Sequence, residues 1–77
     1  MLEKQIQQKV LNYCKAHGIL ALKVDSTSSR GIPDLTVITP EGHVLFVELK
    51  TLTGKLSPLQ TRMHTKLREN NANVFTI

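Results

Sequence analysis

The sequence predicts a small α/β domain in which a mixed sheet of about four strands is flanked by two helices. Apolar residues recur at helical spacing near the N-terminus, three short aliphatic segments follow, and a helix led by proline then precedes a last aliphatic segment. The predicted order is helix, three strands, helix, strand. With 77 residues the chain is one domain, 1–77, and a core this small makes self-association a natural way to enlarge it.

The first predicted helix covers residues 2–17, and Gly18 ends it because glycine readily takes the left-handed turn after a helix. Its apolar residues lie three and four positions apart and so form one face: Leu2, Ile6, Val10, Tyr13 and Cys14. Residues 19–25 then read as a strand, followed by a polar loop over residues 26–31.

Residues 34–39 and 44–50 are two further predicted strands. Only residues 40–43 separate them, which favours an antiparallel hairpin. In the second strand the aliphatic side chains alternate onto one face, which needs a core: Leu45, Val47 and Leu49.

Matching the aliphatic faces of the two strands sets their register. Leu35 then lies near Val47, and Asp34 lies opposite Glu48. In the same register Val37 lies near Leu45. A shift of one residue would turn Asp34 toward the leucines, so the pattern predicts that three charged residues cluster at one end of the hairpin: Asp34, Glu48 and Lys50.

The second predicted helix begins at Ser57, a good N-cap, with Pro58 at the first helical position and Gln60 able to reach back to the cap. An apolar stripe follows along it: Leu59, Met63 and Leu67. The asparagines at 70–71 end the helix, and residues 73–77 form the last strand.

The charged cluster has a chemical interpretation. Two carboxylates within about 5 Å repel each other, and a hard divalent cation with oxygen ligands relieves that repulsion. A lysine beside the cation can contact a scissile phosphate or orient the attacking water, so Asp34, Glu48 and Lys50 suit phosphodiester hydrolysis. The alternative is a surface ion pair across two strands beside an ordinary turn aspartate.

Three segments resemble the virus-type replication-repair nuclease (VRR-Nuc) domains of the PD-(D/E)XK superfamily: Gly-Ile-Pro-Asp-Leu at 31–35, Val-Glu-Leu-Lys at 47–50 and Leu-Ser-Pro-Leu-Gln at 56–60. The resemblance runs from Glu3 to Ile77 and implies a restriction-endonuclease-like core. It also implies that Asp34 and Glu48 ligate Mg²⁺, for which Mn²⁺ can substitute. The backbone carbonyl of Leu49 would be a third ligand, and Lys50 would act on the water or the phosphate.

The same resemblance places Gln60 beside the site as a supporting residue and Glu3 near the metal through a bridging water. For Glu3 the competing interpretation is an exposed glutamate favoured by the helix dipole. For Gln60 it is the capping box with Ser57, and we expect one side chain to serve one of these roles and not both.

The charge balance favours a polyanionic partner, because ten Lys and Arg face six Asp and Glu for a net charge of +4. Candidate contacts to DNA phosphates are Lys23, Arg30, Lys55, Arg62, Lys66 and Arg68, with the hydroxyls of Ser26, Ser28 and Ser29. Arg30 is preferred because it adjoins the aspartate motif. Only three aromatic residues are present, so binding should read backbone and shape more than sequence.

Other classes find little support. One cysteine excludes a disulfide framework, and His17, His43 and His64 fall on different elements, which disfavours a zinc site. Cys14 reads as a small buried hydrophobe. No motif for an organic cofactor, no apolar run of membrane length and no secretory signal appear, so we expect a soluble protein of a reducing compartment.

The resemblance implies an endonuclease that acts on branched DNA such as four-way junctions and leaves a 5′-phosphate and a 3′-hydroxyl. It further implies a homodimer that places two sites on two strands, in the cytoplasm of a bacterium or a phage-infected host. The alternatives are a non-catalytic DNA-binding module on the same fold and a protein-interaction domain.

Overall fold

The computed structural model describes residues 2–24, 30–51 and 54–77. Its elements follow the predicted order: α1 (Glu3–Ala16), β1 (Leu20–Lys23), β2 (Leu35–Ile38), β3 (Val44–Glu48), α2 (Pro58–Glu69) and β4 (Asn73–Thr76). The strands are shorter than the predicted segments, although backbone hydrogen bonds continue past their ends, from the Val24 amide to the Asp34 carbonyl and from the Lys50 amide to the Ile77 carbonyl.

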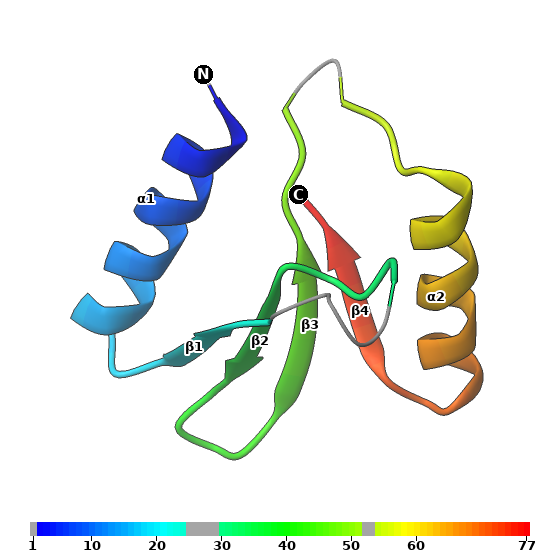
Figure 1. The fold of residues 1–77 in the computed structure, drawn as a ribbon. Coiled ribbons are helices and arrows are strands. Elements are labelled where there is room, and N and C mark those ends of the chain that lie inside the picture. Colours follow the sequence, from blue (N-terminus) through cyan, green and yellow to red (C-terminus); the bar gives the residue numbers. More distant parts are fainter. Residues whose placement is uncertain (1, 25–29, 52–53) are drawn as a thin grey trace.

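The sheet is four-stranded in the order β1-β2-β3-β4, with the two helices beside it (Figure 1). β1 pairs with β2 and β2 with β3 in antiparallel orientation, whereas β3 and β4 are parallel, so the sheet is mixed as predicted. The parallel pair is possible because α2 carries the chain back between β3 and β4.

The predicted hairpin register is confirmed: Leu35 pairs with Val47, and Val37 with Leu45. The buried aliphatic core comprises Leu35, Val37, Val47 and Leu49, and the apolar face of α1 packs on it through Ile6, Val10 and Leu11. Cys14 is also buried, as predicted. The face of β3 that carries Leu45 and Val47, and that Leu49 continues just after the strand, therefore packs against α1, and the opposite face is left for α2.

Both helices end in the same way. The residue after each C-cap has a left-handed backbone, with φ 68° at Gly18 and φ 64° at Asn71. The next residue then donates its amide to a carbonyl in the last turn, Ile19 to Cys14 and Ala72 to Leu67. Glycine and asparagine are the residues that take this conformation most readily, so both predicted helix ends are confirmed.

The predicted apolar stripe of α2 needs a correction. Leu59 is 46% exposed, whereas His64 is 1% exposed and is the most deeply buried residue of the helix. α2 is rotated so that Gln60 and His64, one turn apart, face the sheet. The reason for the rotation is a polar group on the sheet beneath them, which forms the site described next.

Candidate metal centre

Three carboxylates converge at the end of the sheet where β2 begins and β3 ends. Asp34 immediately precedes β2, Glu48 is the last residue of β3, and Glu3 is the first residue of α1. One carboxylate oxygen from each lies within 4.8 Å of the other two. The convergence predicted for Asp34 and Glu48 is therefore observed, and Glu3 joins them from a distant part of the sequence.

Backbone contacts hold Asp34 in place. Its Oδ2 accepts a hydrogen bond of 3.0 Å from the backbone amide of Leu49, in the neighbouring chain segment. Its carbonyl accepts a second bond of 3.0 Å from the amide of Val24, just after β1. Asp34 thus extends the backbone pairing toward β1, and the bond from Leu49 fixes its carboxylate relative to Glu48.

Glu48 is wholly buried, with 0% of its surface exposed. Burial, a hydrogen bond shared with Asp34 and the negative charges of Asp34 and Glu3 raise the pKa of Glu48 to about 8, while Lys50 acts in the opposite direction. The Lys50 Nζ lies 3.9 Å from Glu48 Oε2. A buried glutamate of this kind is not the solvated surface ion pair that the sequence left open.

The carboxylate of Glu48 also contacts α2. Gln60 Nε2 donates to Glu48 Oε2 at 3.5 Å, and His64 Nε2 lies 3.6 Å from Glu48 Oε1. Burial and the charges of Arg68 and Lys50 lower the pKa of His64, which keeps the imidazole neutral. Within the described residues, Glu48 Oε1 and both ring nitrogens of His64 have no hydrogen-bond partner.

Sequence reasoning missed His64 as part of this site. We considered it only as one of three scattered histidines, and it does lie on a different element from His17 and His43. The signal that could have found it is its spacing of four residues from Gln60, which places both side chains on one face of a helix.

The expectation that Gln60 serves only one role is wrong, because the two ends of its amide act separately. Gln60 Oε1 accepts from the Ser57 amide at 2.9 Å and the Gln60 amide donates to Ser57 Oγ at 3.2 Å, which completes the capping box. The NH₂ group remains free to reach Glu48. Likewise Glu3 is both exposed at the start of α1 and a member of the carboxylate cluster.

The positively charged candidates are spread around the molecule. Arg30, Arg62 and Lys66 line one pocket, Lys23 pairs with Leu35 next to Asp34, and Lys55 is exposed. Arg68 is instead tied to the fold, since its guanidinium donates to the Val74 carbonyl at 3.0 Å. The candidates at 26, 28 and 29 lie outside the described residues.

The donor set fits a hard divalent cation. It offers carboxylate oxygens from three residues, and a buried Glu48 oxygen without a hydrogen-bond partner among the described residues is a free ligand. Sulfur and imidazole ligands, which zinc favours, are not part of the cluster that the described residues form.

A mixed sheet covered by two helices, with clustered carboxylates and a lysine at the junction of two strands, is the arrangement that the resemblance to the PD-(D/E)XK nucleases implies. A family model described as "VRR-NUC domain" matches residues 2–77. The chain belongs to this family of nucleases, as the sequence motifs predicted.

Two further comparisons agree. A protein of Acyrthosiphon pisum secondary endosymbiont phage 1 with the name "Putative nuclease p44" is 35% identical over 65 residues, which are 84% of this chain and 70% of that protein. A solved structure titled "VRR_NUC domain" superposes with a TM-score of 0.87 at 37% identity and covers 96% of this chain and 81% of the other. Within the described residues, neither helix has the length and apolar character that crossing a membrane requires.

Proposed function

We propose that this nuclease is a deoxyribonuclease that depends on Mg²⁺ or Mn²⁺ and hydrolyses phosphodiester bonds at Asp34, Glu48 and Lys50. The burial of Glu48 carries the proposal. An ionised carboxylate at 0% exposure is costly to a small domain unless a cation compensates it, and here two further carboxylates increase the need. The three carboxylates therefore lower the stability of the folded domain without a cation and favour the binding of one.

Asp34 and Glu48 would hold the cation directly, with the Leu49 carbonyl as a third ligand and Glu3 through a bridging water. Bound there, a divalent cation supplies Lewis-acid stabilisation of phosphate charge and lowers the pKa of water. Because the raised pKa of Glu48 means that it carries a proton below about pH 8, a cation held by its carboxylate would take the place of that proton.

The remaining polar groups have distinct roles in this proposal. The ammonium of Lys50, 3.9 Å from Glu48, stabilises negative charge that develops on the phosphate or orients the attacking water. Gln60 supports Glu48 from the start of α2 through its amide NH₂. Arg30, Arg62, Lys23 and Lys55, together with Ser28 and Ser29, are the proposed contacts to the DNA backbone.

For the substrate we propose branched DNA such as a four-way junction, cut by a homodimer in the cytoplasm of a bacterium or a phage-infected cell. The phage origin of one relative supports this setting. Exposed apolar residues on the sheet face opposite α1 support self-association: Leu20, Leu22 and Val44 are 53%, 46% and 43% exposed. Two copies would present two centres to two strands.

The test incubates the protein with labelled four-way junctions, flaps, splayed arms and plain duplex, each with Mg²⁺, Mn²⁺ or EDTA. We expect cleavage of the junction only with the metals, with 5′-phosphate and 3′-hydroxyl products. The matched control is Asp34→Asn, because asparagine can still accept the Leu49 amide bond and so keeps the fold. This variant should bind DNA without cutting it.

A chain that binds these DNAs and never cuts them with metal would instead be the DNA-binding module considered above. Cleavage that persists in Asp34→Asn would also contradict the proposed centre.

A further inference from the structure

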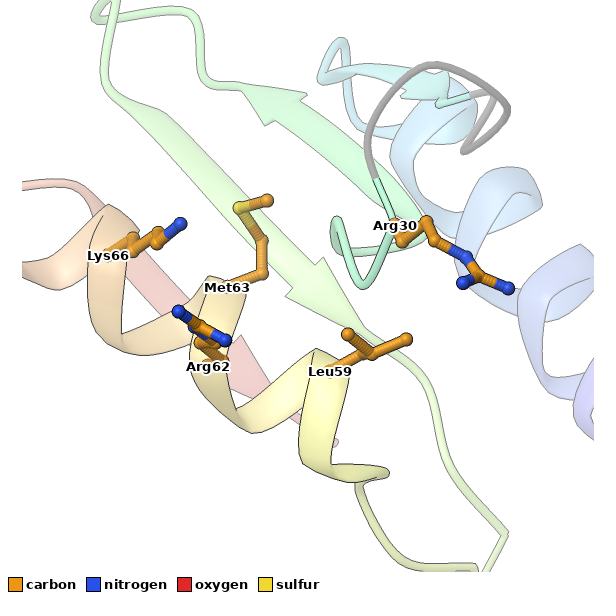
Figure 2. Close-up of a pocket in the computed structure, with 5 residues that line it drawn as sticks. All are labelled: Arg30, Leu59, Arg62, Met63 and Lys66. Atoms are coloured by element: carbon orange, nitrogen blue, oxygen red, sulfur yellow. The ribbon is translucent and has the colours of Figure 1, made fainter.

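A basic pocket lies beside the carboxylate centre, between the loop that carries Arg30 and the exposed flank of α2. Its volume is about 160 Å³, and it is lined by Arg30, Leu59, Arg62, Met63 and Lys66 (Figure 2). The four α2 residues are three and four positions apart, so they form one face of the helix. This is the face that the rotation of α2 leaves exposed when Gln60 and His64 turn toward Glu48.

The cations of the pocket are available to a ligand. Across the described residues, no carboxylate oxygen lies within 4.0 Å of a charged nitrogen of Arg30, Arg62 or Lys66. In Figure 2 the guanidinium of Arg30 extends from its loop away from α2, whereas Arg62 and Lys66 lie along the helix. The three charges are thus spread out, which suits successive phosphates of a nucleic-acid backbone better than a single small anion.

The floor of the pocket is apolar. Leu59 is 46% exposed although it is a large hydrophobic residue, and Met63 is half-buried beside it. Methionine adapts its shape to irregular surfaces, and an apolar floor between cations matches the sugar that separates two phosphates. The volume is well above the roughly 10–15 Å³ that one water needs, so the pocket has more room than one small ion requires.

The pocket and the carboxylate centre are joined by one close contact. A Cβ at Gly31 would overlap the Leu59 carbonyl, so the loop and the start of α2 touch. On the loop, Arg30 lies just before Gly31 and Asp34 lies three residues after it. On the helix, Gln60 directly follows Leu59, so the contact brings the pocket next to the carboxylate centre. From Gln60 to Lys66 the helix rises about 9 Å, which spans about three nucleotides at 3.4 Å each.

We infer that this pocket is a subsite for the DNA backbone, which holds phosphates within about three nucleotides of the bond that is cut. The inference rests on the proposed function, because it needs a DNA strand at the carboxylate centre. Arg62 and Lys66 make the phosphate contacts on α2, Leu59 and Met63 contact the sugar between them, and Arg30 continues the contact along the loop.

The test measures binding of a fluorescent DNA duplex by anisotropy, in EDTA, between 50 and 200 mM salt. Removal of two phosphate contacts in Arg62→Gln/Lys66→Gln lowers the slope of log affinity against log salt by about 1.8. Over this salt range the unaltered protein should therefore lose about twelvefold more affinity than the variant. The matched control, Lys9→Gln/Lys15→Gln, removes the same charge from exposed positions of α1 and should leave the slope unchanged.

A second variant guards against damage to the helix. The exchange Arg62→Lys/Lys66→Arg keeps both charges and should keep the slope of the unaltered protein. Equal slopes for the unaltered protein and the Gln variant, or an equal decrease in the α1 control, would overturn the subsite. A protein that never cuts DNA with metal contradicts the proposed function; if the slopes still differ as expected, the pocket contacts the DNA backbone but does not lie beside a bond that is cut.

Discussion

The two helices cover opposite faces of the sheet in contrasting ways. α1 packs Ile6, Val10 and Leu11 on a core of aliphatic residues. α2 places Gln60 and His64 against a wholly buried glutamate. Burial of apolar surface contributes about 25 cal/mol per Å², whereas a buried polar atom without a partner costs about 1–3 kcal/mol.

The two faces of the sheet differ in what they contribute: one stabilises the fold and the other carries the polar groups of the site. The α1 face holds the domain together and fixes the register of β2 and β3. The α2 face retains buried polar atoms that have no partner among the described residues, a cost that pure folding would not favour. Under the proposed function, a cation bound at this face offsets that cost.

The largest expected effect is on stability and comes from a substitution in the core that α1 covers. Leu35→Ala removes a side chain with 0% exposure and should lower the free energy of unfolding by about 2–5 kcal/mol, since it leaves a cavity in the core. Leu2→Ala, at 70% exposure, should change it by less than about 0.5 kcal/mol. Urea unfolding followed by circular dichroism measures both, and similar losses at the two leucines would contradict this assignment of the core.

An intermediate effect is expected on Mn²⁺ affinity and tests whether His64, on the α2 face, orients Glu48. His64 Nε2 lies 3.6 Å from Glu48 Oε1, so a small movement lets a neutral imidazole protonated at Nε2 donate to that oxygen. His64→Leu fills the space without a donor and should weaken Mn²⁺ binding by about 10–100-fold, as loss of an orienting partner does. His64→Gln supplies an amide donor and should recover much of that affinity.

Calorimetric titration with Mn²⁺ distinguishes these two variants without any measurement of cleavage. Equal affinities in the Leu and Gln variants would mean that His64 only fills space.

The smallest effect concerns pH. The folded pKa of Glu48, about 8, is above its unfolded value of 4.5, so the folded state holds a proton that the unfolded state has lost. In EDTA the free energy of unfolding should therefore decrease by about 1–2 kcal/mol between pH 6.5 and pH 8. Below pH 6.5 the lowered pKa of His64 acts in the opposite direction, because the unfolded state then binds the extra proton.

Urea unfolding at several pH values checks this expectation. Glu48→Gln has no proton to lose and should show a flat profile from pH 6.5 to pH 8, with higher stability than the unaltered protein at pH 8. Saturating Mg²⁺ should remove the decrease in the unaltered protein, since the cation binds the ionised form. A decrease of the same size in Glu48→Gln would assign the titration to another group.

Alternation of aliphatic residues was sufficient to predict the sheet register and the meeting of Asp34 with Glu48. A shift by one residue would have turned Leu35 and Val37 away from the face that carries Val47 and Leu49, so the hydrophobic effect left one choice. Turn chemistry predicted both helix ends, because few residues take a left-handed backbone without strain.

The rotation of α2 was not predictable from its own sequence. Apolar periodicity favoured burial of Leu59, but the buried partner across the interface is a carboxylate, and hydrogen-bonding groups pack against it instead. Local patterns describe one helix at a time, whereas this rotation depends on what the sheet presents. His64 was open to prediction only through Gln60, one turn earlier on the helix, because its neighbour Glu48 lies 16 positions earlier in the chain.

Gly31 is a structural residue whose substitution would have the same effect on activity as the loss of a catalytic residue. It carries no reactive group, yet any side chain there would collide with the Leu59 carbonyl and wedge the loop away from the helix. Asp34 and the basic pocket would then move apart, and catalysis would fail although every reactive residue is still present. A survey of inactivating substitutions would therefore rank this glycine among the reactive residues, although what it contributes is the absence of a side chain at this contact.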